Sequence, residues 1–269
     1  YSTEGSTKCT TCIEGTYSAE GSPECTSCVA GTYSEEGAGN CTQCPEGFTT
    51  RTEGSLSSAD CTVCDSGYYI DGDQCTLCAE NYDSQVGASQ CYFYPATKDD
   101  LVQAVQEWIS AGADTTTVES TYGHIRTWDT SRITDMSELF AYQDINIDIS
   151  TWNTSSVTDM EGMFAFNTTF AANISAWDVG KVTSMNNMFN GTIFNEDISS
   201  WNVENVQDMG YMFYQNQYFN QDISGWDTSS VTNMAYMFGG KSKTNDDGTV
   251  TIYSAFNQPI GSWDTSNVT

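Results

Sequence analysis

The sequence predicts a mainly β chain, in which a disulfide-rich array of small modules is followed by a β-solenoid with short helical turns. Two observations carry this prediction. All 11 cysteines fall within residues 1–91, and from Trp128 to Trp226 a tryptophan recurs every 24 or 25 residues. A segment with so few apolar residues needs cross-links to hold its fold. A repeat of this period marks a solenoid, whose coils bury their apolar sides against one another.

The composition limits the partners. The 269 residues include 36 acidic and 8 basic ones, which gives a formal net charge of −28. Such a surface repels nucleic acid and anionic membranes, so neither is expected as a partner. No stretch approaches the roughly 20 apolar residues that span a bilayer, so we expect no membrane insertion in this segment. Since no signal peptide is visible, we expect Tyr1 to follow processing or truncation.

The cysteines of residues 1–91 form five Cys-x-x-Cys pairs and a lone Cys91. Such pairs hold zinc in reducing compartments or form disulfides in secreted proteins. Glycine and an aromatic residue follow four of the pairs, as in Cys12-Ile-Glu-Gly-Thr-Tyr, whereas Cys78-Ala-Glu-Asn-Tyr has asparagine at the glycine position. Because this segment has almost nothing else to form a core, we interpret it as about five disulfide-bonded modules.

One ladder of disulfides accounts for ten of the cysteines. The second cysteine of each pair bonds the first of the next, and each loop contributes about 3 kcal/mol to stability in the chain-entropy model. The predicted bonds are Cys12–Cys25, Cys28–Cys41, Cys44–Cys61, Cys64–Cys75 and Cys78–Cys91. Cys9 is left to pair upstream of Tyr1. Interlocked pairings, such as Cys9–Cys25 with Cys12–Cys28, fit the same spacings.

Residues 9–91 resemble the small cysteine modules of ephrin-receptor-like and tumour-necrosis-factor-receptor-like ectodomains. Their signature is Cys-x-x-Gly-x-Tyr followed by a closing cysteine, and the motifs above carry it. The resemblance implies an extracellular or cell-surface location and no particular ligand.

Residues 92–127 are predicted to be a helical cap. Thr97 is a helix N-cap followed by acids in the first turn. The apolar residues that follow at helical spacing are Leu101, Val105, Trp108 and Ile109, and Gly112 ends the helix. We expect this helix to cover the first coil, because a solenoid needs an end that is polar outside. The alternative is a helix that binds a partner.

Residues 128–269 form the predicted solenoid, with about twelve residues inserted near 241–253. Methionine lies eight residues after each of five tryptophans, and phenylalanine twelve after. We interpret this methionine row as core, since it keeps register with tryptophan, isoleucine and valine. Ile-x-x-Trp and Val-Thr-x-Met are predicted to be short strands, and Met-x-x-Met-Phe a single helical turn. Asp247-Gly248 predicts the turn of a projecting hairpin.

The repeat of residues 125–269 resembles the surface-protein repeats of mycoplasma-type lipoproteins, a branch of the BspA-like leucine-rich repeats. The segment Tyr122-Gly-His-Ile-Arg-Thr-Trp128 resembles the usual entry into the first coil of that family. The resemblance implies a leucine-rich-repeat-type solenoid and a role in adhesion or surface recognition. A chain broken off before Cys9 and after Thr269 would be part of a longer repetitive molecule.

Catalysis finds little support, whereas cation binding is a hypothesis. His124 is the only histidine, so neither a nucleophile–base pair nor a two-histidine metal site can form around it, and we expect no enzyme and no cofactor. Two carboxylate rows could hold calcium, which takes six to eight oxygens. Their members are Asp129, Asp178, Asp227, Asp148, Asp197 and Asp222. The alternative is that these side chains make turns between coils.

Six asparagines stand in Asn-x-Ser/Thr sequons. Asn40, Asn167 and Asn190 are predicted to lie in loops and to be the best glycosylation sites. Asn153 and Asn173 adjoin predicted strands and are expected to be less accessible; the sixth is Asn267.

Two functions are open. The first is a non-enzymatic, extracellular surface protein that binds a protein or glycan ligand on the strand face of the solenoid. The residues expected there are Thr151, Ala176, Ser200, Gly225 and Ser262. The second is a structural subunit of an extracellular filament, hair or coat, in which exposed strand edges contact other copies of the chain.

Overall fold

The computed structural model describes residues 11–245 and 249–269. The chain divides into two compact units, Tyr1–Tyr92 and Phe93–Thr269. Cys9 and the predicted Asp247-Gly248 turn lie outside the described residues. Among the residues that the structure describes, no helix combines the length and the apolar character that crossing a membrane requires.

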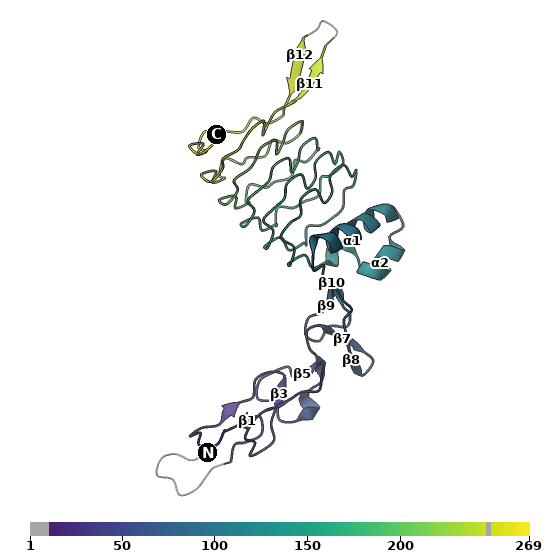
Figure 1. Cartoon of the computed structure of the whole chain (residues 1–269), viewed down its shortest axis with the longest axis vertical. Helices are drawn as coiled ribbons and strands as arrows, with labels where there is room; N and C mark the ends of the chain where they lie inside the picture. Colours follow the sequence, from purple (N-terminus) through teal and green to yellow (C-terminus); the bar gives the residue numbers. More distant parts are fainter. Residues whose placement is uncertain (1–10, 246–248) are drawn as a thin grey trace. The chain divides into compact units, whose positions relative to one another are not determined.

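The first unit is built from small paired strands (Figure 1). In each pair, one strand begins directly after the glycine position of the motif and contains its aromatic residue, and the partner strand contains or follows a closing cysteine. The pairs are β1 (Thr16–Tyr17) with β2 (Thr26–Ser27), β3 (Thr32–Tyr33) with β4 (Thr42–Gln43), β5 (Phe48–Thr49) with β6 (Val63–Cys64), β7 (Tyr68–Asp71) with β8 (Gln74–Leu77), and β9 (Tyr82–Asp83) with β10 (Tyr92–Phe93). A short 3-10 helix, η1 (Ser58–Asp60), precedes β6.

Five disulfides cross-link this unit, with Cα–Cα distances of 5.3–5.8 Å. They are Cys12–Cys25, Cys28–Cys41, Cys44–Cys61, Cys64–Cys75 and Cys78–Cys91. This is the ladder connectivity, in which the second cysteine of one pair bonds the first of the next. The alternatives of zinc binding and of a Cys12–Cys28 bond are therefore wrong for these ten cysteines.

The glycine of the cysteine motif has a conformational role. Gly15 has φ 76°, and a Cβ atom there would lie 2.2 Å from the carbonyl oxygen of Gly54, so no larger residue fits. The last module has Asn81 at this position with φ 64°. Asparagine tolerates the left-handed region better than most residues, which explains the one departure from the motif.

The second unit begins with the predicted helix, α1 (Lys98–Ala111). Thr97 caps it, and the carboxylate of Asp100 accepts a hydrogen bond from the Thr97 backbone N–H, which completes a capping box. The buried face consists of Leu101, Ala104, Val105 and Trp108. The helix ends at Gly112, where φ is 61°. The shorter helix α2 (Thr116–Tyr122) and the 3-10 helix η2 (Ile125–Thr127) were not predicted.

The helix α1 covers the first coil, as expected of a cap. Trp108 meets Trp128 edge to face with ring centroids 6.0 Å apart, and Phe93 approaches Trp128 at 5.2 Å. These rings leave Trp128 only 2% exposed. His124 contributes its ring to the same cluster, 5.3 Å from Trp108, and its Nδ1 accepts a hydrogen bond from the Arg126 N–H.

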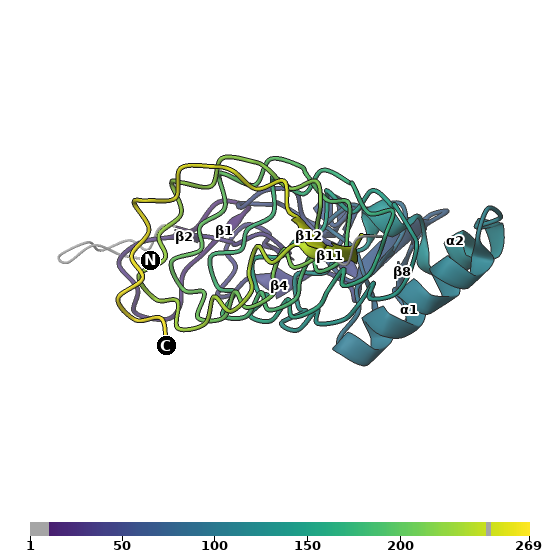
Figure 2. The same ribbon diagram turned by 90° about the horizontal axis from the view of Figure 1, so that it is seen from above.

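Residues 128–269, apart from an inserted hairpin, form a stack of coils that lie side by side (Figures 1 and 2). We call this part the coil stack. The first methionine of each of the first four coils is fully buried, and the phenylalanines stack on their equivalents in the next coil at centroid distances of 5.6–5.7 Å. The buried methionines are Met136, Met160, Met185 and Met209. The methionine row is core, as predicted.

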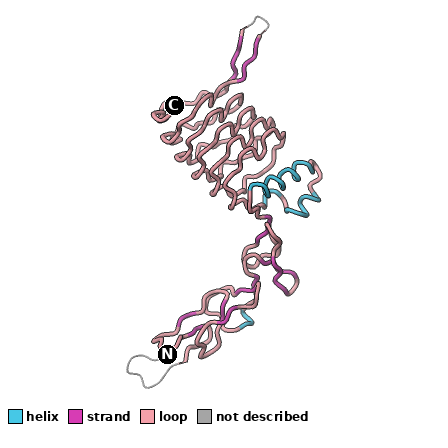
Figure 3. The backbone as a smooth tube through the Cα atoms, viewed as in Figure 1, coloured by secondary structure: helices cyan, strands magenta, loops and turns pink. Residues whose placement is uncertain are grey.

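Backbone hydrogen bonds join each coil to the next. Met136 N donates to Asp159 O at 2.9 Å, and Glu138 N donates to Glu161 O at 2.8 Å. The equivalent bonds recur between the following coils. The coils are regular, but almost all of their residues are in loops and turns and not in helices or strands (Figure 3). The predicted strand Val-Thr-x-Met is reduced to one parallel bridge residue per coil: Asp135, Asp159, Ser184, Asp208 and Asn233.

The Ile-x-x-Trp segment is a turn and not the predicted strand. Trp152 N donates to Ile149 O at 3.1 Å, and the Asp148 carboxylate accepts from Ser150 N at 3.1 Å and from Ser150 Oγ at 2.6 Å. Side-chain bonds of this kind favour a turn over extended backbone. The tryptophan does point inward, and Trp152 Nε1 donates to the carbonyl of Ile125 in the preceding coil at 2.9 Å.

The Met-x-x-Met-Phe segment is likewise not a helical turn. Met163 N donates to Met160 O at 3.2 Å, which closes a tight turn, but Gly162 between them has φ 57°. A left-handed residue interrupts a right-handed helix. The equivalent residues of the other coils have φ between 52° and 58°: Glu138, Asn187, Tyr211 and Tyr236.

The insertion in the last coils forms the strand pair β11 (Lys241–Thr244) and β12 (Val250–Tyr253). The two strands are antiparallel, with Lys241 opposite Tyr253, and they project from the coil stack (Figure 1). Projection was predicted, although the turn itself lies outside the described residues.

Candidate functional site

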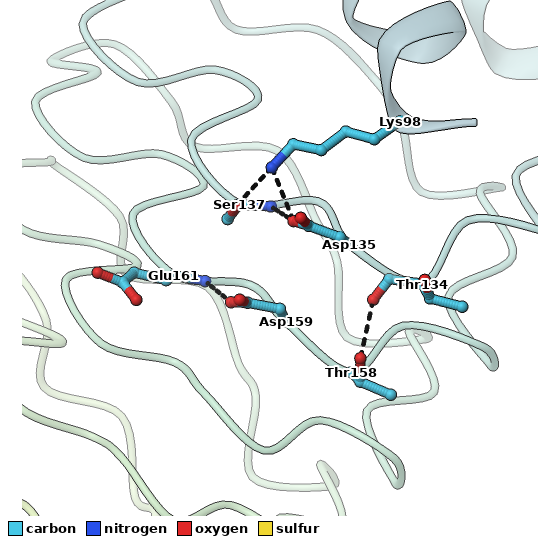
Figure 4. Close-up of polar contacts among 7 residues, drawn as sticks. All are labelled: Lys98, Thr134, Asp135, Ser137, Thr158, Asp159 and Glu161. Carbon is cyan, nitrogen blue, oxygen red and sulfur yellow. Dashed lines mark hydrogen bonds and ion pairs between the residues drawn. The ribbon is translucent and has the colours of Figure 1, made fainter.

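Lys98, the first residue of α1, ties the cap to the outward surface of the first coil (Figure 4). Its Nζ lies 2.8 Å from Asp135 Oδ1 and 2.5 Å from Ser137 Oγ. Partial burial by itself would raise the pKa of Asp135, but the bonds from Lys98 and Ser137 and the lysine charge lower it below its ordinary value. Asp135 is thus a paired carboxylate.

Among the described residues, the carboxylates Asp159 and Glu161 of the next coil form no ion pair. Asp159 accepts a hydrogen bond from Glu161 N at 2.8 Å (Figure 4). Partial burial raises the pKa of Glu161, and the charges of Asp159, Asp208 and Glu138 raise it further. Within the described residues, neither Glu161 nor Glu138 forms an ion pair. The outward surface of the first two coils therefore concentrates negative charge.

Further along the stack, amides replace the charges. Asp208 Oδ1 accepts from Asn186 Nδ2 at 2.9 Å, from Asn233 Nδ2 at 3.0 Å and from Gly210 N at 2.8 Å. A Cβ atom at Gly210 would lie 2.6 Å from the Asn233 amide nitrogen, so glycine leaves room for the two amides. This carboxylate is satisfied by three donors.

Two exposed rings belong to the same two coils as Glu138 and Glu161. Tyr142 is 73% exposed and Phe166 is 37% exposed, and their rings stack with centroids 5.0 Å apart. The Phe166 ring lies over Gly191, where a Cβ atom would be 2.8 Å from Phe166 Cδ1. The backbone bond from Tyr142 N to Ala165 O, 2.8 Å long, holds the two positions side by side. The rings form a fixed pair.

The six carboxylates predicted to bind calcium lie in turns. In each coil, the oxygen accepts from the residue two positions on, as Asp227 does from Ser229 Oγ at 2.7 Å. Hydrogen bonds of this kind from serine lower the pKa of Asp148, Asp197, Asp222 and Asp227. The partners of the other two are Ser131 and Gly180. Over residues 11–245 and 249–269, no three acidic, histidine or cysteine side chains are arranged to hold a metal ion.

The predicted order of glycosylation sites is wrong for the folded chain. Asn167 is fully buried, with Nδ2 donating to Ile145 O at 2.9 Å, and Asn190 is 6% exposed with Nδ2 bonded to Asn187 Oδ1. Both side chains face the inside of the coils, where no glycan fits. Asn190 Oδ1 is a buried acceptor without a hydrogen bond among the described residues.

The sequons that were expected to be less accessible are exposed. Asn153 and Asn173 each accept from a serine two positions on through Oδ1, which leaves Nδ2 on the surface. Asn173 also lines a surface groove of about 470 Å³. Asn40 is exposed, as predicted, and Asn267 is exposed with Nδ2 donating to Ser229 O at 2.7 Å.

The residues expected on a strand face lie in the turns that precede each tryptophan. Several hydroxyls are tied to the preceding coil: Thr151 Oγ1 donates to Arg126 O at 2.5 Å, and Ser262 Oγ donates to Ser224 O at 3.0 Å. The other members of this row are Ala176, Ser200 and Gly225. The row is exposed, and its hydroxyls bond the backbone of the preceding coil.

Sequence reasoning missed Lys98, Glu161 and the two rings. Tyr142 and Phe166 lie six residues after the first methionine of their coils, where the next coils have Gly191 and Gln215. The signal available in the sequence was that this position of the repeat varies and that an aromatic residue occupies it in two neighbouring coils.

Comparison with protein families gives matches to both units. Residues 15–61 match the family described as "Tyrosine-protein kinase ephrin type A/B receptor-like". Residues 110–202 and 192–269 match the family described as "Mycoplasma protein of unknown function, DUF285", and together these matches span more than half of the chain. No curated protein and no solved structure is detectably similar. The chain therefore belongs to the DUF285 family of Mycoplasma-type proteins of unknown function.

Proposed function

We propose that the protein is a non-enzymatic, extracellular surface protein whose coil stack is a leucine-rich-repeat-type solenoid and serves adhesion or recognition. The observation that carries this proposal is the contrast between inner and outer positions. The buried rows repeat tryptophan, isoleucine, methionine and phenylalanine through the coils, whereas the row of left-handed turn residues varies, reading Glu138, Gly162, Asn187, Tyr211 and Tyr236. A fixed core with a varied surface suits a binding scaffold.

The first unit supports the location. Five disulfides persist in oxidising surroundings, and the match to ephrin-receptor-like modules fits an extracellular location. The net charge of −28 keeps such a surface soluble and argues against nucleic acid as the partner.

The test uses the intact, disulfide-bonded chain, fluorescently labelled at its N-terminus. We expect saturable binding to a subset of targets on protein and glycan arrays, with the chain itself dispersed as monomers in light scattering. Absence of saturable binding on both arrays would contradict the proposal.

A second candidate is a structural subunit of an extracellular filament or coat. The backbone bonds between coils favour it. Met136 N donates forward to Asp159 O and Thr158 N donates back to Thr134 O, so each coil offers both donors and acceptors to a neighbour, which suits head-to-tail addition. Regular polymers in negative-stain electron microscopy, appearing as divalent cations are added to screen the charge, would support this candidate. Dispersed particles under all of these conditions would exclude it.

A further inference from the structure

The pair of exposed rings, Tyr142 and Phe166, stands at positions where the backbone is strained. Their φ angles are 59° and 57°, and Glu138 in the same coil as Tyr142 has φ 58°. The left-handed region is unfavourable for a residue with a side chain, and glycine avoids this cost. Gly162 and Gly191 occupy the equivalent positions of neighbouring coils. The rings and the Glu138 side chain therefore stand at positions where glycine would fold more easily.

The ring pair is a rigid platform with one free face. Phe166 is held between Tyr142 on one side and the backbone of Gly191 on the other. Tyr142 remains 73% exposed although one of its faces meets Phe166, so its opposite face is open to solvent. An aromatic face carries a negative quadrupole and attracts cations, arginine above all, as well as their apolar stems.

The charges beside the platform have the matching sign. Glu138 and Glu161 are exposed, and their backbones are joined by a 2.8 Å bond. The Glu138 side chain lies over Gly162, where a Cβ atom would be 3.5 Å from Glu138 Cγ. Neither has an ion pair within the described residues, and Lys98, the nearby cation, is occupied by Asp135. Each carboxylate thus precedes a ring by four or five residues in the same coil, Glu138 before Tyr142 and Glu161 before Phe166, and no cation of the described chain is paired with it.

We propose that the surface formed by Glu138, Tyr142, Glu161 and Phe166 binds an arginine- or lysine-rich segment of a partner protein. The proposal rests on the recognition function proposed above and names the site and the chemistry of the ligand. The free Tyr142 face receives a guanidinium or ammonium group, and the two carboxylates pair with neighbouring cations. The net charge of −28 speeds the encounter with such a partner and repels acidic ones.

The test measures the affinity of the intact, disulfide-bonded chain for a fluorescein-labelled peptide of alternating arginine and glycine, by fluorescence anisotropy. The double variant Tyr142→Gly/Phe166→Gly is expected to bind about tenfold more weakly. It should melt no lower than the unchanged chain, because glycine relieves the left-handed strain. The matched control is Tyr236→Gly, which removes an exposed ring with φ 52° elsewhere in the stack and should leave the affinity unchanged.

A second pair of variants separates the local carboxylates from the overall charge. Glu138→Gln/Glu161→Gln should weaken binding and reduce its salt dependence. Glu53→Gln/Glu80→Gln, two exposed residues of the first unit, makes the same change in net charge and should have little effect. Equal effects of the two pairs, or full affinity of the ring variant, would overturn the proposal.

Two further outcomes are informative. If the ring variant keeps its affinity for the peptide but loses binding to neutral oligosaccharides that the unchanged chain binds, the platform is a glycan site and the proposal is wrong. If the peptide does not bind at all while the intact chain still binds targets on the arrays, the basic-peptide site fails and the recognition function stands.

Discussion

The amide nitrogen of Asn167 donates to the carbonyl oxygen of Ile145 at 2.9 Å inside the coil. Its Oδ1 accepts from the backbone N–H groups of Thr169 and Phe170, so the whole amide is used to close the return loop of the coil. The equivalent Asn216 does the same two coils later, with Nδ2 donating to Phe194 O at 2.9 Å. A sequon residue is thus a structural element of the core.

We predict that Asn167→Ala destabilises the coil stack by about 2–3 kcal/mol, because it leaves buried backbone groups without partners. Asn153→Ala, at an exposed sequon, should change stability by less than about 0.5–1 kcal/mol. Urea unfolding followed by tryptophan fluorescence measures this, since every tryptophan of the chain lies in the second unit. Equal stabilities of the two variants would show that the amide does not hold the loop.

We predict that glycosylation, when the chain is secreted from a host that adds N-glycans, occurs at Asn40, Asn153 and Asn173. Their amide nitrogens are on the surface, whereas those of Asn167 and Asn190 are enclosed. Peptide mass spectrometry of the folded, monomeric fraction gives the occupancy of each site. A glycan on Asn167 in that fraction would contradict the structure.

We predict that calcium does not change the melting temperature of the chain by more than about 1 °C relative to a chelator at matched ionic strength. Calcium requires six to eight oxygens, and carboxylates such as Asp148 and Asp222 already accept turn hydrogen bonds from serine. Thermal unfolding in calcium, magnesium and chelator checks this. A rise specific to calcium would restore the carboxylate rows as a binding site.

We predict that Glu161→Gln raises the melting temperature by about 1 °C at neutral pH and low salt. Burial and the neighbouring carboxylates raise the pKa of Glu161, so its ionised form is disfavoured in the folded state. The folded state of the unchanged chain therefore gains relative stability as Glu161 takes up a proton. The difference between the two proteins should be largest at neutral pH and should vanish below the ordinary pKa of glutamate.

Salt should reduce the same difference, because it screens the repulsion. Glu53→Gln is the control, since it makes the same chemical change at an exposed position of the first unit. A gain that is independent of pH would show that the charge of Glu161 is not its cause.

We predict that Cys28→Ser/Cys41→Ser weakens the first unit by about 3 kcal/mol, through loss of a cross-link over 13 residues. Limited proteolysis should cleave the variant faster between these positions. The urea transition seen by tryptophan fluorescence should stay unchanged, because the second unit carries its own core. A shift of that transition would show that the second unit depends on the first.

Periodicity predicted the core well and the local backbone poorly. Trp152 and Met160 are buried, as the repeated spacing of tryptophan and methionine along the chain predicted. The conformation between them depends on interactions that periodicity does not report. Asp148 bonds Ser150 and makes a turn where an apolar pattern suggested a strand, and Glu138 takes a left-handed conformation where a helical turn was expected.

The sequence by itself determined that cysteines hold the first unit and which residues fill the coils, because a segment without a core needs cross-links and apolar periodicity leaves few physical solutions. The structure decided between the ladder and the interlocked pairings, which fit the same spacings. Only the tertiary structure decided which polar residues face outward. Asn167 and Asn153 have the same sequon, yet the first closes a loop inside the coil and the second lies on the surface. The Tyr142–Phe166 platform, likewise, exists only where two coils meet. A polar side chain is placed by the partners that the neighbouring coil offers, and those partners lie about 24 residues away in the chain.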